Sequence, residues 1–565
     1  MTDKPTAFIL DITFSGGQKF TLTPNEKIIL VGPNNSGKSQ SLRDILEIAK
    51  GVDPKYNTVV RAMTLNKTGS EKELESFLEE NASSNKGVFQ YKAWAVNSQH
   101  LKFWREPYLK NLWSEFIKKV DANERLNICA KQNSVGPTDQ KSKPQHVLYD
   151  DSTLMEKISG HFRSAFGKDI MFDFRGGKVI PIHVGELPDA SLVDRVSDAY
   201  VSVVRENPYL DDQGDGMKSY AGILFETIVE DHDVTLLDEP EAFLHPPQMR
   251  RLGDTLASEV VGQLIVATHS SDIMRGFLEG TKGDVRILRI RRDGSKNLVA
   301  EASPETISEL WSRPVLRYSN ALDGVFHEQT IICEDDSDCR LINAVADHLT
   351  SNSDSPWPDT CYVPTGGKFG VPKVADVLRK IGVPIKAVFD IDFLADKSLV
   401  KDTVLAFGGN WDELETPWSR VDAAVRSGVK PKTNEEIKES IRGILDKSAP
   451  EALPKGDIAE ALKQGKPWSQ VKRFGEAGIP SGDAQKEYQL LREGLEKIGI
   501  YLVPVGELEG FCREIGLHGP KYVNTLLADV PLDDSKLDDL RTFVEKVHRG
   551  ARSPLPDDPM TESVE

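Results

Sequence analysis

Four acids within a window of five residues, from Glu334 to Asp338, have the side chains and spacing of a metal site. Charge runs more often lie on solvated surfaces, so the flanking residues must decide between the two interpretations. Residues 330–333 predict a short strand, and the apolar positions after the acids repeat at helical spacing. We therefore expect the acids at the carboxyl end of a strand, where open α/β sheets bind ligands. This placement favours metal binding by Glu334 over a solvated charge run.

Two further pairs of acids follow apolar stretches later in the chain. Asp390 and Asp392 come after a predicted buried strand, and Glu507 and Glu509 come after another. In an extended chain, side chains two residues apart point to the same side, so Asp390 and Asp392 are expected to share a divalent cation. Two carboxylates this close repel each other unless a cation or a proton compensates them. An ordinary turn remains the alternative for this pair taken alone.

A glycine turn lies between the first two acidic segments. Gly366-Gly367-Lys368 follows a predicted strand and precedes a predicted helix. Glycines allow the backbone to approach a ligand closely, and Lys368 could contact a phosphate. The alternative is an ordinary loop with a solvated lysine.

The first half of the chain contains a complete phosphate-binding loop. Residues 26–50 run from an apolar strand through a loop into a helix, and the loop reads GxxxxGKS. In this motif backbone N–H groups surround the phosphates, the lysine reaches the terminal phosphates, and the serine hydroxyl can bind Mg²⁺. The predicted nucleotide ligands are Gly32, Asn34, Asn35, Ser36, Gly37, Lys38 and Ser39.

A second nucleotide motif follows about 200 residues later, at the end of another short apolar strand. Asp238 is predicted to hold Mg²⁺ through water, and Glu239 to orient the attacking water. A third apolar strand ends in His269, which is predicted to sense the γ-phosphate. ATP and Mg²⁺ or Mn²⁺ are therefore the expected cofactors.

These three segments resemble the nucleotide-binding heads of the ABC class, in the branch of RecF-like and SMC-like DNA-maintenance ATPases. In that class a signature loop from a second protomer covers the ATP. The expected position holds a degenerate signature, in which Gly214, Gly216 and Ser219 would meet phosphates bound by the second protomer. The sequence FSGGQ at 14–18 matches the usual signature better. It precedes the phosphate loop, however, and is predicted to be a hairpin turn.

Bulk composition limits the remaining choices. A chain of 565 residues is expected to form two to four domains, and its net charge of −18 argues against purely electrostatic binding to nucleic acid. The five cysteines form no CxxC pair, which gives no indication of a zinc site or a disulfide framework. We find no long apolar stretch, so a protein without membrane contact, in the cytoplasm, is expected.

The second half resembles a Toprim domain, the metal-binding fold of topoisomerases, DnaG-type primases and certain nucleases. ICEDDSD resembles its EGxxD segment, with Asp335 in place of glycine, and VFDID resembles its DxD segment. An ABC head followed by Toprim, with GELEGF closing the domain, resembles the overcoming lysogenization defect (OLD) family of ATP-dependent nucleases. The nuclease subunit of Gabija and OLD-type retron effectors belong to this circle, which implies antiviral defence.

The resemblance implies an α/β fold, an ABC/RecF-like P-loop head followed by a Rossmann-like Toprim domain. The head would cover residues 1–320, with an inserted segment at about 50–210. The Toprim domain would cover 325–515, with a helical insertion at about 395–498 that is a solvated addition, a gate for DNA or a docking site for a partner. Residues 516–565 would form a C-terminal segment with a disordered tail.

The function implied is an ATP-regulated, metal-dependent DNA endonuclease. Two ions would be held by Glu334, Asp338, Asp390 and Asp392, with Glu507 and Glu509 completing the second site. A lysine usually assists in this family, and Lys521 is the first candidate and Lys368 the second. DNA, a homodimer or larger homo-oligomer, and a helicase or a reverse transcriptase with retron DNA are the implied partners. The alternative is an ATP-switched DNA-binding sensor or scaffold with a decayed Toprim site.

Overall fold

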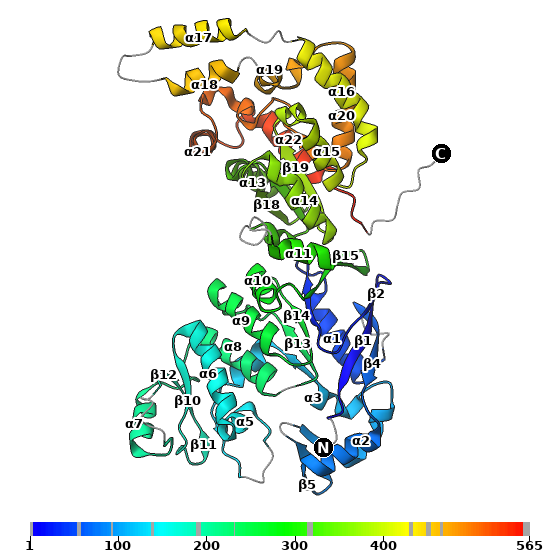
Figure 1. Cartoon of the computed structure of the whole chain (residues 1–565), viewed down its shortest axis with the longest axis vertical. Helices are drawn as coiled ribbons and strands as arrows, with labels where there is room; N and C mark the ends of the chain where they lie inside the picture. The colour runs from blue at the N-terminus through cyan, green and yellow to red at the C-terminus, as the bar shows by residue number, and fades with distance from the viewer. Residues whose placement is uncertain are drawn as a thin grey trace. The chain divides into compact units, whose positions relative to one another are not determined.

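The computed structural model describes residues 4–53, 58–91, 94–136, 141–187, 194–230, 232–312, 320–428, 433–447, 454–463 and 467–556. The chain divides into two compact units, residues 1–313 and 314–565 (Figure 1). Each unit has its own sheet and its own hydrophobic core, and each is described by itself.

The first unit is built on a six-stranded sheet in the order β16-β15-β3-β14-β13-β8. Five of these strands run parallel, and β16 pairs antiparallel with β15. Buried Val, Ile and Leu residues dominate the central strands, as expected for a sheet covered on both faces. The strands are β3 (Lys27–Val31), β8 (Ile117–Val120), β13 (Val234–Asp238), β14 (Gln263–Ala267), β15 (Arg286–Asp293) and β16 (Lys296–Glu301).

A second, antiparallel sheet combines β1 (Ala7–Phe14), β2 (Lys19–Thr21) and β4 (Val60–Lys67). Helix α1 (Lys38–Ala49) packs between this sheet and the six-stranded sheet, and Leu42, Ile45 and Ile48 on its apolar face join one core with both. The predicted hairpin turn at 14–18 joins β1 to β2, where Phe14 N donates to Gln18 O at 2.9 Å. FSGGQ is therefore a turn, as its position in the sequence predicts.

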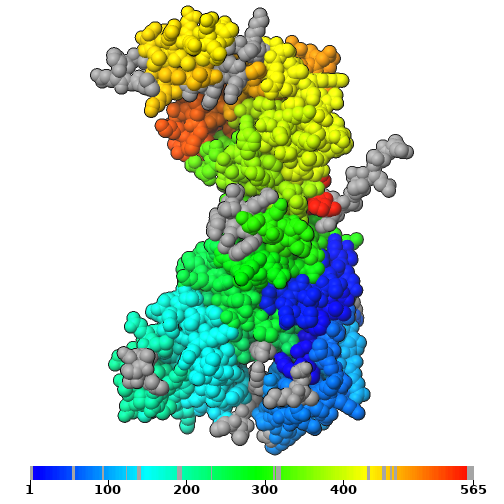
Figure 2. Space-filling model, in the orientation of Figure 1, coloured from blue at the N-terminus to red at the C-terminus, as the bar shows by residue number. Residues whose placement is uncertain are grey.

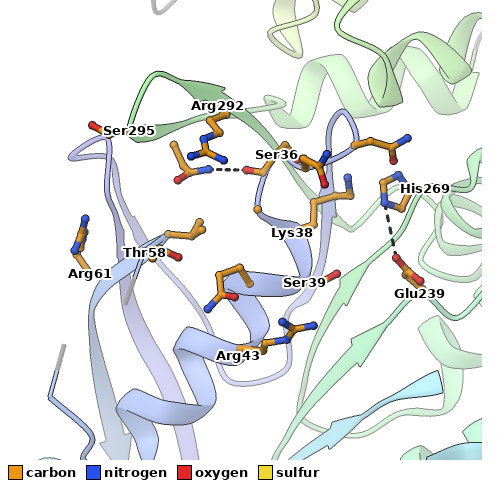
Figure 3. Close-up of a pocket in the computed structure, with 16 residues that line it drawn as sticks. Ser36, Lys38, Ser39, Arg43, Thr58, Arg61, Glu239, His269, Arg292 and Ser295 are labelled. Carbon is orange, nitrogen blue, oxygen red and sulfur yellow. Dashed lines mark hydrogen bonds and ion pairs between the residues drawn. The ribbon is translucent and has the colours of Figure 1, made fainter. Parts of the chain in front are cut away.

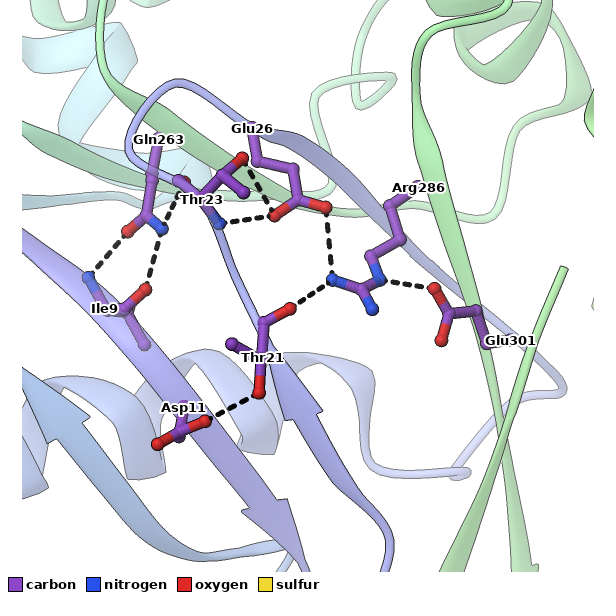
Figure 4. A network of polar contacts seen from close by, with 8 residues as sticks. All are labelled: Ile9, Asp11, Thr21, Thr23, Glu26, Gln263, Arg286 and Glu301. Atoms are coloured by element: carbon purple, nitrogen blue, oxygen red, sulfur yellow. Dashed lines mark hydrogen bonds and ion pairs between the residues drawn. The ribbon is translucent and has the colours of Figure 1, made fainter. Parts of the chain in front are cut away.

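Polar contacts hold the two sheets of the first unit together (Figure 4). The Gln263 side chain on β14 accepts from Ile9 N at 2.7 Å and donates to Ile9 O at 2.8 Å, so it substitutes for a strand neighbour of β1. Arg286 on β15 donates to Thr21 O of β2 at 2.7 Å and to the Glu301 carboxylate at 2.6 Å. The buried Gln263 contacts and the exposed contact of Arg286 with Thr21 thus fix how the two sheets lie against each other.

The segment predicted as an insertion at 50–210 is in part an integral piece of the head. Strand β4 pairs with β1, and β8 forms the edge of the six-stranded sheet beside β13. That part of the prediction is wrong, because a long interval between two motifs does not reveal which strands return to the main sheet. The remainder includes α6 (Ser152–Phe166), α7 (Asp198–Glu206) and a hairpin of β10 (Asp169–Phe172) with β12 (Ile182–Gly185).

The second unit contains a four-stranded parallel sheet in the order β18-β17-β19-β20. Its strands are β17 (Gln329–Cys333), β18 (Thr360–Pro364), β19 (Ile385–Phe389) and β20 (Ile500–Leu502). Helix α13 (Asp336–Ser351) follows β17, and α14 (Val371–Lys380) follows β18 and packs on β19. The carboxyl ends of these strands therefore meet at one edge of the sheet, as the βα pattern predicts.

The interval between β19 and β20 is helical, as predicted. It contains α15 (Lys397–Ala406), α16 (Trp411–Gly428), α17 (Asn434–Lys447), α18 (Lys455–Lys463), α19 (Pro467–Phe474) and α20 (Asp483–Lys497). Helix α17 buries no side chain and lies at the surface of the unit (Figure 2). Helices α16, α19 and α20 pack together and bury Trp418, Trp468 and Leu491, so this part is folded into the unit.

The residues after 515 do not form a separate segment, contrary to the prediction. Helices α21 (Pro520–Asp529) and α22 (Asp538–Arg549) share one core with α13, β17 and β19. The buried Lys386 on β19 donates to the carbonyls of Val547 and His548 at 2.8 and 2.6 Å. Most of the predicted disordered tail lies outside the described residues, at 557–565. Among the described residues, no helix combines the length and apolar character needed to cross a membrane.

Candidate functional site: a nucleotide pocket and an acidic cluster

The GxxxxGKS segment forms a loop between β3 and α1 and lines a cavity of about 730 Å³ (Figure 3). Gly32, Asn35 and Gly37 all have positive φ, and a Cβ on Gly32 would lie 2.1 Å from Ile290 O. The Lys38 ammonium donates to the carbonyls of Gly32 and Pro33 at 2.7 and 2.8 Å, which holds the loop closed around it. Of the seven predicted loop ligands, all but Gly32 line this cavity.

The second and third nucleotide motifs reach the same cavity. Ser39 Oγ donates to Asp238 Oδ1 at 2.8 Å, so the two predicted Mg²⁺ ligands are adjacent. Glu239 and His269 line the cavity from the ends of β13 and β14, with 4.0 Å between Glu239 Oε1 and His269 Nε2. Figure 3 shows these two side chains on one side of the loop and Arg61 on the other.

Burial shifts the pKa values of three side chains around this pocket. It lowers the pKa of Lys38 to about 8 and the pKa of His269 to about 4, where the neighbouring Lys38 also disfavours a charged imidazole. Burial raises the pKa of Asp238. His269 is thus neutral at physiological pH, which suits hydrogen bonding to a phosphate oxygen rather than ion pairing.

Two side chains that the sequence patterns do not reveal position these motifs. Arg125, fully buried on α4 (Ala122–Asn127), donates to Glu239 O at 2.8 Å and to Asp238 O at 3.3 Å. Asn297 on β16 donates from Nδ2 to Ser36 O at 2.6 Å, and its backbone N donates to Ser15 Oγ at 2.8 Å. No motif marks either residue, because each acts on backbone atoms of a segment distant in the sequence.

The predicted signature segment lies at the start of α8 (Asp215–Leu224). Gly214 precedes the helix, and Gly216 approaches Phe243 O so closely that a Cβ would lie 2.8 Å from it. Ser219 is fully buried and donates to Ala242 O at 3.2 Å. Ser219 therefore belongs to the packing of α8 against the loop after β13, and its hydroxyl does not face outward as the predicted role requires.

In the second unit, the sheet brings acids from two strand ends together. Glu334 follows β17, Asp390 follows β19, and Asp392 lies two residues on; one carboxylate oxygen from each lies within 4.8 Å of the others. Glu334 Oε1 is buried and has no hydrogen-bond partner among the described residues. An orphaned buried carboxylate oxygen, aimed into a group of hard oxygen donors, fits a divalent cation.

Asp390 and Asp392 converge for a different reason from the one that their spacing predicts. The chain after β19 does not stay extended. Asp390 caps a 3₁₀ helix (Ile391–Ala395), and Phe393 N donates to Asp390 O at 3.0 Å. The tight turn, rather than strand alternation, places Asp392 beside Asp390.

Within the opening run of acids, Glu334 joins Asp390 and Asp392, whereas Asp335, Asp336 and Asp338 belong to the start of α13. Asp335 is the N-cap of α13, and its backbone N donates to Asp338 Oδ2 at 3.2 Å. Asp336 is exposed and pairs with Arg340 at 3.0 Å. Asp335, where the Toprim pattern has glycine, thus serves as a cap, and Asp338 supports the cap as well as facing Asp390.

The remaining predicted residues differ in how near they lie to Glu334, Asp390 and Asp392. Glu507 pairs with His518 at 3.8 Å, while Glu509 accepts from Gly519 N at 2.7 Å. Lys368 lies 3.4 Å from Asp392 Oδ1, so the second lysine candidate reaches the cluster. Lys521 is exposed on α21, and the structure does not bring this first candidate into contact with the acids.

The glycine turn supports the cluster through its backbone. Gly366 and Gly367 both have positive φ, and Gly367 N donates to Glu334 O at 2.8 Å. The turn therefore fixes the backbone of Glu334 and delivers Lys368 to Asp392.

Burial and mutual repulsion raise the pKa values of the clustered acids. Burial, followed by repulsion from Asp390 and Asp392, raises the pKa of Glu334 to about 8. Burial and the charge of Asp390 raise the pKa of Asp338 to about 7. Burial raises the pKa of Asp390 to about 6, against the attraction of Lys472. A bound cation would relieve this repulsion.

Comparisons with known proteins agree with the first of these sites. A family described as "AAA domain, putative AbiEii toxin, Type IV TA system" matches residues 27–275. The first unit is a P-loop ATPase domain. The match and the parallel sheet with its GxxxxGKS loop decide this, and the domain carries a nucleotide site.

Among curated proteins, the Old nuclease of Escherichia phage P2 is 25% identical over 168 residues, which is 28% of this chain and 28% of that protein. Among solved structures, an Smc head domain from Pyrococcus furiosus is 11% identical with a TM-score of 0.32, covering 54% of this chain and 98% of that one. The SMC head domain from Thermotoga maritima is 12% identical with a TM-score of 0.28, covering 54% and 100%.

Outside the ATPase domain, the acidic cluster contains a lysine that the sequence patterns miss. Lys472 on α19 lies 2.6 Å from Asp390 Oδ2, 3.6 Å from Glu507 Oε2 and 4.0 Å from Asp392 Oδ1. Burial opposes its charged form, but the attraction of Asp390 and Asp392 outweighs burial and raises the pKa of Lys472 above its usual range. The helical insertion thus contributes to the site, and the alternative of a solvated addition does not hold for α19.

Proposed function

We propose that the protein is an ATP-regulated, divalent-metal-dependent DNA endonuclease that hydrolyses phosphodiester bonds at the acidic cluster of the second unit. The observation that carries the proposal is the convergence of Glu334, Asp390 and Asp392 at the sheet edge, where one buried carboxylate oxygen of Glu334 has no partner in the described part of the chain. The partial similarity to a nuclease supports the reaction class. The strand order and acid positions support a Toprim domain.

The chain's own residues suit phosphodiester hydrolysis. A divalent ion held by Glu334, Asp390 and Asp392 would supply Lewis acidity and an activated water. Lys368 and Lys472, both within ion-pair distance of the aspartates, would attract a phosphate and stabilise the charge that develops on its oxygens. Asp338 accepts a hydrogen bond from the backbone N of the N-cap residue Asp335, which supports the start of α13 next to Glu334.

ATP would act through the nucleotide pocket of the ATPase domain. Lys38, Ser39 and Asp238 would bind the phosphates and Mg²⁺, while Glu239 and His269 would face the γ-phosphate. We further propose that two heads close on the nucleotide as dimers or larger homo-oligomers, with Gly214 and Gly216 of one protomer near the nucleotide of the other. Because of the resemblance to the OLD family, we also propose a defence role against phage and a helicase or reverse-transcriptase partner.

A plasmid-cleavage assay tests the proposal. Supercoiled DNA is incubated with the protein and Mg²⁺ or Mn²⁺, with and without ATP, and nicked and linear products are counted. Asp390→Asn should abolish cleavage, whereas Asp376→Asn, a change in an exposed ion pair on α14, should leave it intact. Full cleavage by Asp390→Asn would reject the acidic cluster as the nuclease site, whereas no cleavage by the unmodified protein would favour an ATP-switched sensor.

A further inference from the structure

Lys472 lies inside the acidic cluster rather than at its rim. Its ammonium group contacts Asp390, Asp392 and Glu507, with distances of 2.6, 4.0 and 3.6 Å. These acids come from the ends of two different strands, β19 and β20. A lysine that joins them occupies the same kind of position as a cation shared by bridging carboxylates.

The backbone around Lys472 is held against the sheet edge by two glycines. A Cβ on Gly506 would lie 1.9 Å from Lys472 O, and a Cβ on Gly475 would lie 2.2 Å from Pro504 O. Both glycines have positive φ, and Glu476 N donates to Pro504 O at 2.9 Å. Since Gly506 O also accepts from Ile391 N at 2.9 Å, one loop fixes both α19 and the turn that carries Asp392. Lys472 is therefore a built-in part of the site.

The acids expected to complete a second metal site already have partners. Glu507 faces Lys472 on one side and His518 on the other. Glu509 accepts a hydrogen bond from Gly519 N. By contrast, Glu334 Oε1 is buried without a partner among the described residues. Among the described residues, the carboxylate oxygen that still lacks a positive partner therefore belongs to Glu334. Glu507 and Glu509 are already paired with groups of the protein.

The charges support the same division. Glu334, Asp390, Asp392 and Glu507 can carry four negative charges, and Lys472 and Lys368 supply two positive charges in contact with them. Asp338 and Glu509, nearby, each accept a hydrogen bond from a backbone N–H. One divalent ion therefore balances the net charge of these four acids and two lysines.

We propose that the Lys472 ammonium group takes the place of a second metal ion, so that the cluster binds a single divalent cation through Glu334, Asp390 and Asp392. This inference rests on the proposed metal-dependent function and revises the two-ion arrangement that the family resemblance implies. It also makes α19, a helix of the insertion, an indispensable part of the site.

The test counts ions in the full-length protein without nucleotide. Mn²⁺ is titrated by calorimetry into the protein and into Asp390→Asn, and the difference in stoichiometry counts the ions that depend on the cluster. The expected difference is one ion per chain, and electron paramagnetic resonance of the loaded protein should show no spin-coupled pair. Lys472→Met should gain a second ion and a coupled-pair signal, whereas Lys472→Arg should keep one.

Two outcomes overturn the inference without touching the proposed function. One is a coupled Mn²⁺ pair in the unmodified protein, and the other is a folded Lys472→Met variant that still binds one ion. If Lys472→Met does not fold, as judged by its thermal transition, the count in the unmodified protein decides. If Asp390→Asn binds as many ions as the unmodified protein, the metal site itself is absent, and the proposed function fails together with the inference.

Discussion

Glu334 is the residue at which the electrostatic strain of the cluster is greatest. Its carboxylate is largely buried, faces two aspartates, and leaves one oxygen without a partner among the described residues. For an acid whose folded pKa is raised to about 8, the folded state binds more protons than the unfolded state between pH 4.5 and 8. The stability of the metal-free protein therefore falls as pH rises through that window.

Glu334→Gln should separate stability from metal binding. At pH 8 and above, the metal-free variant should have a higher Tm than the unmodified protein, because it removes a charge that is costly there. At pH 4.5 the two should coincide. Added Mn²⁺ should raise the Tm of the unmodified protein and leave the variant unchanged. Scanning calorimetry across pH, with and without Mn²⁺, measures this, and a lower Tm for the variant at pH 8 would contradict it.

Asn297 is predicted to position the phosphate-binding loop. Asn297→Ala removes the donor to Ser36 O, a buried hydrogen bond worth about 1 kcal/mol, so ATP should bind on the order of fivefold more weakly. Ser295→Ala changes an exposed residue that lines the same cavity and should have little effect. Titration with a fluorescent ATP analogue compares the two, and equal affinities would show that Asn297 does not support the loop.

Whether a site residue could be predicted depends on whether a local sequence pattern identifies it. The loop ligands and the strand-end acids share fixed spacings and apolar flanks, so their types and places follow from periodicity. Asn297, Arg125 and Lys472 act across more than eighty residues, on backbone atoms or on acids of another element. No local pattern encodes such a contact. Lys521, the first lysine candidate, is exposed and makes no contact with the clustered acids within the described residues.

At the scale of elements, the docking of α19 determines whether the cluster has its lysine. The loop after β20 approaches the end of α19 so closely that only glycine fits at Gly506, whose φ is +107°. That same loop accepts a hydrogen bond from the turn after β19. The site therefore depends on a backbone contact between an insertion and the sheet edge.

Gly506→Ala should displace α19 and damage the site. The matched control is Gly482→Ala, because Gly482 also has positive φ, +96°, but a Cβ there would meet nothing within 4 Å. The control should cost only the backbone strain of about 1 kcal/mol, whereas Gly506→Ala should lower the Tm further and weaken Mn²⁺ binding. Equal Tm values and equal Mn²⁺ affinities for the two variants would show that the close approach is unimportant.

The sequence predicts which segments are helices or strands better than it predicts how they pair and pack. The strands before the acids, the helix after Glu334 and the helical insertion follow from apolar periodicity. The return of β8 to the main sheet and the packing of α22 on α13 do not, because pairing between distant segments is decided by tertiary contacts. The DxD turn shows the same limit on a small scale, since a 3₁₀ turn replaced the expected extended chain.

At the scale of the whole molecule, each of the two units carries one of the two candidate sites. The nucleotide pocket draws its described lining residues from the first unit, and the acidic cluster draws its members from the second. Binding of nucleotide and binding of the cluster's metal ion should therefore be separable by mutation, even where ATP regulates cleavage.

Lys38→Ala should abolish ATP binding while the Mn²⁺ that depends on the cluster binds with unchanged affinity. Asp390→Asn should do the reverse, keeping ATP hydrolysis and losing that Mn²⁺. The reason is that Lys38 lines the nucleotide pocket of the first unit, whereas Asp390 belongs to the acidic cluster of the second. Nucleotide binding, ATP turnover and Mn²⁺ calorimetry on both variants measure this. Loss of both activities in either variant that retains its fold would contradict two independent sites.

The central claim is that the acids at the ends of β17 and β19 hold a catalytic divalent ion, and anomalous diffraction from crystals soaked in Mn²⁺ tests it most directly. We predict one strong anomalous peak in the second unit, coordinated by Glu334, Asp390 and Asp392, with Lys472 Nζ retained beside Asp390. The peak should vanish in Asp390→Asn crystals. No peak among these three acids, at Mn²⁺ concentrations that support activity, would contradict the account.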